Sequence, residues 1–101
     1  MQHQDTQQNQ EPHQAFEALV DTIQNKFDGV VEHGTDQELF IAGYLSGHFS
    51  LVVSQCQLQG EETAAALNTQ MLASLDKAFA DGELEEPDQQ QVKAFWAACI
   101  Q

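Results

Sequence analysis

Apolar residues recur at three- and four-residue steps along most of the chain, which is the spacing of one helix face. The first such stripe indicates a helix that begins near Pro12, because proline suits the first turn of a helix. His33 and Gly34 end it, and we expect Gly34 to take the left-handed conformation common after a helix. The stripe consists of Phe16, Leu19, Val20, Ile23, Phe27, Val30 and Val31.

Thr35 and Glu38 have the spacing of a capping box, which predicts the start of a second helix. This helix is expected to reach about Leu58. It is apolar nearly all round, as is typical of the most buried helix in a bundle.

Two more helices are predicted beyond Gly60, one over about 62–80 and one over about 86–100 with Trp96 facing inward. The connections are short, so successive helices should be antiparallel neighbours. The predicted fold is therefore all-α, an antiparallel up-and-down four-helix bundle.

The helical pattern of apolar residues does not reach the N-terminus, so the chain divides into a tail and a domain. Residues 1–14 are rich in Gln and His and have nothing apolar after Met1, which predicts a disordered N-terminal tail. Residues 15–101 then form a single helical domain.

The charge balance narrows the classes of partner. The chain has 16 acidic residues, three lysines and no arginine, for a net charge of −13. Such a surface repels nucleic acids and anionic membranes, whereas a basic protein partner remains open. The sequence lacks the pattern of a signal peptide and any apolar run near the ~18 residues of a membrane helix. We therefore expect a cytoplasmic protein, with Cys56 and Cys99 as reduced thiols in the core.

Gly43 and Gly47 lie one turn apart on the second helix, where each glycine costs about 1 kcal/mol relative to alanine. Close packing of a large side chain against them, such as Phe95 or Trp96, is the simpler interpretation. Gly47→Leu would then destabilise the fold by about 1–3 kcal/mol through overpacking. The alternative is a ligand groove or a face for self-association.

Tyr44 and His48 are also one turn apart and can touch. His48 continues an apolar stripe, so a partly buried structural histidine is the simpler interpretation. The alternative is a metal ligand or acid–base residue that acts with His33 and an acid such as Glu38. These histidines have no recognised metal-binding spacing, and no catalytic or cofactor-binding motif is present.

The acidic turn 81–88 also fails the calcium-loop pattern, since Val92 stands where a bidentate Glu belongs. We therefore predict no catalytic residue, metal or cofactor.

The segment 32–48 contains a distinctive run of residues: His33, then Asp36-Gln37-Glu38-Leu39-Phe40, then Gly43-Tyr44-Leu45-Ser46-Gly47-His48. This run resembles the signature of the YfcL family of small gammaproteobacterial proteins. Ser74–Ala78, Gly82–Leu84, Asp88-Gln89 and Trp96 also resemble its C-terminal half. The chain departs from the pattern at Pro87, one place late, and in its Gln-rich extension. The resemblance implies a bacterial cytoplasmic helical protein and supplies no activity.

These observations support two hypotheses of different kinds. The leading one is a non-enzymatic, acidic protein-interaction module, monomeric or weakly dimeric, whose candidate face includes Gly43 and Gly47. The alternative is a helical domain that binds a small ligand or metal around Tyr44, His48 and His33.

Overall fold

The computed structural model describes the backbone of residues 2–100 and the side chains of residues 12–100. Within this part of the chain there are four helices and no strand: α1 Gln2–His33, α2 Asp36–Gln59, α3 Ala64–Ala80 and α4 Glu86–Ile100. The prediction of an all-helical fold with four helices is confirmed. Since α1 begins at Gln2, Pro12 lies inside the helix and not at its start. The division of the chain into a disordered tail over 1–14 and a domain over 15–101 stays a prediction.

The caps of α2 follow from local hydrogen bonds. The Glu38 backbone N–H donates to Thr35 Oγ1 at 3.2 Å, and the Thr35 N–H donates to Glu38 Oε1 at 3.0 Å. This is the predicted capping box, and it satisfies two N–H groups at the start of the helix. At the other end, Gly60 takes a left-handed conformation with φ of 71°.

Gly34 corrects one expectation, because it is not among the glycines with positive φ. A Cβ at this position would lie 2.7 Å from the Val30 carbonyl oxygen. Close approach of the backbone therefore explains this glycine, not a left-handed turn.

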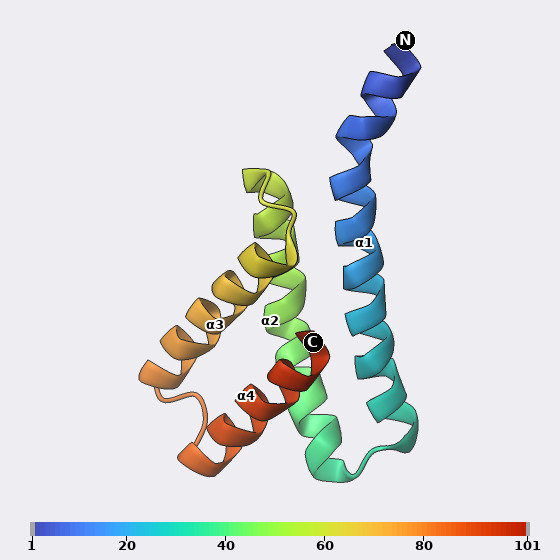
Figure 1. Ribbon diagram of the computed structural model, residues 1–101. Helices are drawn as coiled ribbons and strands as arrows, with labels where there is room; N and C mark the ends of the chain where they lie inside the picture. The colour runs from blue at the N-terminus through green and yellow to red at the C-terminus, as the bar shows by residue number, and fades with distance from the viewer. Residues whose placement is uncertain (1, 101) are drawn as a thin grey trace.

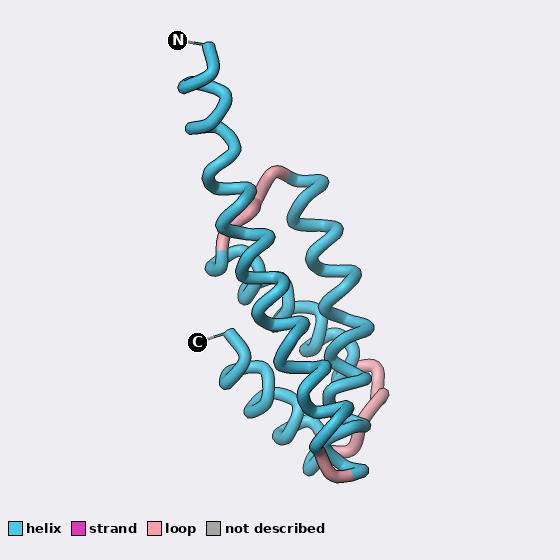
Figure 2. Tube along the Cα trace, turned by 90° about the vertical axis from the view of Figure 1, so that its right-hand side faces the viewer, coloured by secondary structure: helices cyan, strands magenta, loops and turns pink. Residues whose placement is uncertain are grey.

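The helices are arranged around α2, which contacts each of the other three (Figure 1). α1 lies alongside α2, while α3 and α4 cross α2 obliquely as a pair. The first turns of α1 extend beyond the other helices in both views (Figures 1 and 2). The central position of α2 agrees with its apolar sequence.

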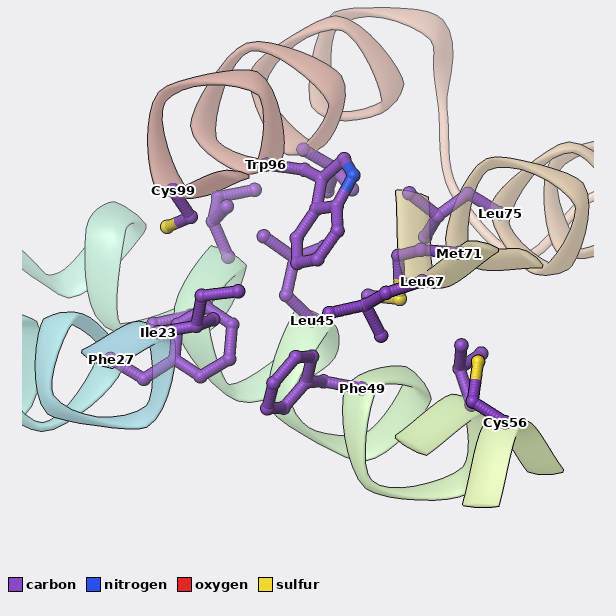
Figure 3. Packing of buried hydrophobic residues seen from close by; sticks show 14 of the residues in the cluster. Ile23, Phe27, Leu45, Phe49, Cys56, Leu67, Met71, Leu75, Trp96 and Cys99 are labelled. Atoms are coloured by element: carbon purple, nitrogen blue, oxygen red, sulfur yellow. The ribbon is translucent and has the colours of Figure 1, made fainter. Parts of the chain in front are cut away.

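The core lies where α2 meets the other three helices (Figure 3). Trp96 is 1% exposed, and its indole N–H donates to Asn68 Oδ1 at 2.8 Å. Phe27 and Phe49 pack edge to face with ring centroids 5.5 Å apart. The core residues on α2 are Ile41, Ala42, Leu45, Phe49, Val52 and Cys56. Because these residues occupy one side of α2, its other side is left for solvent or for a partner.

Among the helices of the described chain, α2 alone is long and apolar enough to cross a membrane, judged by length and composition. The sequence expectation that no segment would approach this limit is therefore wrong. A core helix passes the same test, and six residues of α2 are buried in the core.

Candidate functional site

The side of α2 that faces away from the core exposes several large apolar side chains. Phe40, Leu51 and Leu58 are 47%, 58% and 88% exposed. Gly43 and Gly47 lie between them and are also exposed. We call these five residues the α2 face.

The α2 face carries no full charge along its length. Residues 39–60 contain no Asp, Glu, Lys or Arg, in a chain with 16 acidic residues. Acidic residues stand at both ends of this segment instead, at Glu38 and Glu61. A partner could therefore cover the α2 face without burying a charge of this chain, a burial that is costly unless the charge is paired.

The two glycines leave open space on the α2 face. A Cβ at Gly43 or Gly47 would meet no atom within 4 Å among the described residues. Trp96 is instead buried beside Phe49, with ring centroids 6.0 Å apart, and Phe95 stacks on Phe27 at 6.1 Å. The expectation that Phe95 or Trp96 packs against these glycines is wrong, so overpacking gives no reason for Gly47→Leu to destabilise the fold.

Tyr44 and His48 do touch, as their spacing predicted, with ring centroids 4.7 Å apart. The Tyr44 hydroxyl donates to Glu83 Oε1 at 2.8 Å, and the His48 Nε2 lies 3.9 Å from the same oxygen. On the other side of its ring, His48 Nδ1 is 2.8 Å from Ser74 Oγ. Burial, reinforced by Glu83, raises the pKa of Tyr44 to about 12, so its hydroxyl keeps its proton at neutral pH. This polar cluster joins α2 to α3 and to the turn before α4.

Two hollows flank the polar cluster and meet at Leu51. One, of about 350 Å³, is lined by Tyr44, Gly47, His48 and Leu51. The other, of about 390 Å³, continues along α3 and is lined by Leu51, Gln55, Gln70, Ala73, Ser74 and Lys77. We call the two together the α2–α3 groove.

His33 lies outside this groove. Its side chain is largely exposed, with Nε2 3.5 Å from Glu32 Oε2. It lines a separate hollow of about 410 Å³, bordered by Lys26, Val30, Phe95 and Cys99 among others. The structure thus brings Tyr44, Gly47 and His48 to one hollow and places His33 at another.

Two chemical features of the described residues limit what the site can do. No group of three or more His, Cys, Asp or Glu side chains is placed to hold a metal ion among them. Both cysteines are free and buried, and burial raises the pKa of each thiol above its ordinary value. The thiolate is the reactive form of cysteine, so burial and the raised pKa both lower the reactivity of these thiols.

Comparisons with known proteins support the family resemblance. A family model described as "YfcL protein" matches residues 14–101. A relative from Escherichia coli (strain K12), "Uncharacterized protein YfcL", is 39% identical over 74 residues, which cover 73% of this chain and 80% of the relative. The chain belongs to the YfcL family. No solved structure matches it.

The family match covers every residue of the α2 face and of the polar cluster, since all lie within residues 14–101. It carries no activity with it.

Sequence reasoning missed the partners that complete the polar contacts. Ser74 lies 26 residues from His48, and Asn68 lies 28 residues from Trp96. His13, which its composition placed in the tail, contacts Glu17 at 2.9 Å and also Glu62, in the connection between α2 and α3. Short-range spacing could indicate that His48 and Trp96 need partners, but not which residues supply them.

Proposed function

We propose that this chain is a non-enzymatic protein-interaction module that binds its partner through the α2 face. The observation that carries the proposal is an exposed apolar stripe with no full charge on an otherwise strongly acidic chain. Exposed apolar patches bordered by polar residues mark interaction sites in soluble proteins. The glycines support the same role, since their bare backbone lets another chain approach closely.

The partner should be a protein that carries positive charge. A net charge of −13 repels phosphate backbones and anionic lipid surfaces. The same charge attracts a basic protein and speeds its association. As part of this proposal, we place the chain in the cytoplasm, as a monomer or weak dimer.

A binding role also fits the polar cluster better than catalysis does. In this cluster Glu83 contacts Tyr44 and His48, and Ser74 contacts His48 alone. Ser74 lies in the interior of α3, where neighbouring backbone N–H groups are engaged in the helix and cannot stabilise an oxyanion. We interpret the cluster as a clamp that holds α2 against α3, and we propose an antiparallel up-and-down course for the four helices.

Site-specific photocrosslinking tests the interaction role. A photoreactive phenylalanine analogue replaces Leu51 on the α2 face or, as a control, Val31 on α1, which is similarly exposed at 58% against 63%. In a lysate of the source bacterium, we expect a discrete crosslinked protein from position 51 that is absent from position 31. The same products from both positions, or none from position 51, would contradict the proposal.

A second candidate function is supported by the hollow at Tyr44, Gly47 and His48. Its volume of about 350 Å³ falls within the range of small-ligand sites, roughly 300–1,000 Å³. A ligand at 100 times its dissociation constant adds about 2.7 kcal/mol to stability. Thermal melts with a panel of metals and metabolites test it, and a panel that leaves the melting temperature unchanged removes this candidate.

A further inference from the structure

The α2–α3 groove differs from the rest of the surface in how its charges are placed. Leu51 is at its centre, with Gly47 and Ala73 beside it on the two helices. Among the described lining residues, Lys77 alone carries a full charge, and its Nζ lies 3.3 Å from Asp81 Oδ2. In the middle of the groove, Leu51 therefore lies among small residues and uncharged polar side chains such as Gln55 and Ser74.

Carboxylates stand at both ends of the groove. Glu83 marks one end through its contacts with Tyr44 and His48. Glu61 marks the other, where its Oε2 lies 3.4 Å from Gln70 Nε2. Neither glutamate has a Lys partner among the described ion pairs, so both can accept a cation from outside.

The spacing of the two carboxylate ends follows from helix geometry, since Tyr44 contacts Glu83 and Gln59 accepts from the same Gln70 amide as Glu61. From Tyr44 to Gln59, α2 rises about 1.5 Å per residue, or roughly 22 Å in all. A second helix laid along it spans the same length in about 14–15 residues. Residues 14 apart are two heptads apart and so lie on nearly the same side of a helix.

We propose that the α2–α3 groove binds an amphipathic helix of another protein that carries Lys or Arg about 14 residues apart, on either side of an apolar stripe. The apolar stripe packs on Leu51 and Gly47, and the two cations meet Glu83 and Glu61. This is the helix-in-groove mode of recognition. The inference rests on the proposed function, and it specifies the shape and charge of the partner.

Charge complementarity argues against a second copy of this chain as the occupant. A second copy brings 16 more acidic residues and three lysines. Lys77 and Lys93 already pair with Asp81 and Asp76, and Lys26 Nζ donates to the Cys99 carbonyl oxygen. None of the three lysines of a second copy is therefore free to meet Glu83 or Glu61, and like charges brought together oppose binding.

Model peptides test this inference with the full chain. The probe is a fluorescein-labelled helical peptide of about 18 residues, with a Leu and Ala stripe and lysines 14 apart. Its counterpart carries Glu in place of the two lysines. Fluorescence anisotropy gives the dissociation constant of each for the wild type, Leu51→Asp and Val31→Asp. The two variants add the same negative charge at similarly exposed sites, so nonspecific attraction of a basic peptide rises to a similar extent in both.

We expect the Lys-ended peptide to bind the wild type and Val31→Asp alike, and Leu51→Asp about tenfold more weakly. The double variant Glu61→Gln/Glu83→Gln should weaken binding and reduce its dependence on salt. Circular dichroism checks that each variant is folded.

Three results would overturn the inference: no binding, equal binding of the two peptides, or equal loss in Leu51→Asp and Val31→Asp. Light scattering that shows a dimer broken by Leu51→Asp would assign the groove to a second copy instead. If photocrosslinking at position 51 still captures a protein while the peptides fail, the helical partner is wrong and the interaction role stands.

Discussion

Gly47→Ala should stabilise the protein, and the sign of this change tests whether the groove is open. Gly47 lies in the interior of α2, and a Cβ there would meet no atom within 4 Å among the described residues. Replacing a helix-interior glycine by alanine, with nothing to clash, gains about 1 kcal/mol. In a domain of this size that raises the melting temperature by about 4–8 °C.

Urea unfolding monitored by fluorescence measures this change directly, because Trp96 is the one tryptophan of the chain and is buried in the core. The midpoint should rise while the slope with denaturant stays constant. Gly60→Ala is the matched control. Gly60 has a φ of 71°, where a Cβ costs about 1–2 kcal/mol, so the same substitution should destabilise the fold. A destabilised Gly47→Ala would show that something packs against this glycine and would refute the open groove.

Three further predictions concern the core, the α2 cap and the cysteines. Asn68→Ala leaves the buried Trp96 N–H without its acceptor and should cost about 1–3 kcal/mol in urea unfolding, while Asn68→Asp, which keeps an acceptor, should cost less. The Thr35 N–H holds the pKa of Glu38 below its ordinary value of 4.5. The ionised Glu38 therefore stabilises the fold above pH 4.5, and this stabilisation is lost as the pH falls through the lowered pKa. Glu38→Gln should lose less stability on acidification than the wild type, and an equal dependence of unfolding free energy on pH would count against the capping box. Both buried thiols should react slowly with Ellman's reagent in the native state and fast in urea, whereas fast native labelling would contradict their burial.

Local signals were the predictable part of the fold. Thr35 and Glu38 predicted the start of α2 because a capping box is made within four residues. The stripe on α1 predicted the burial of Phe16, Ile23 and Phe27, since polar residues mark its opposite side. Its last residue, Val31, is nevertheless exposed, because α1 nears its end there and only one side of the helix faces the core.

The candidate site was harder to predict, because α2 is apolar on nearly every side. No stripe of polar residues on α2 indicated which side would face solvent. By sequence, Phe40 and Leu51, which are exposed, were as suited to the core as Leu45 and Phe49, which are buried. For Gly47 the sequence favoured close packing over open space, and the structure shows open space. Which one holds depends on where α3 and α4 cross α2, and that is set by packing between residues far apart in the chain (Figure 1).

The central claim is that the α2 face is a binding surface, and crosslinking from position 51 compared with position 31 tests it most directly. The two positions are similarly exposed, and only position 51 lies on the α2 face. The account predicts a discrete protein captured from position 51 and not from position 31. Identical products from the two positions, or no product from position 51, would contradict it.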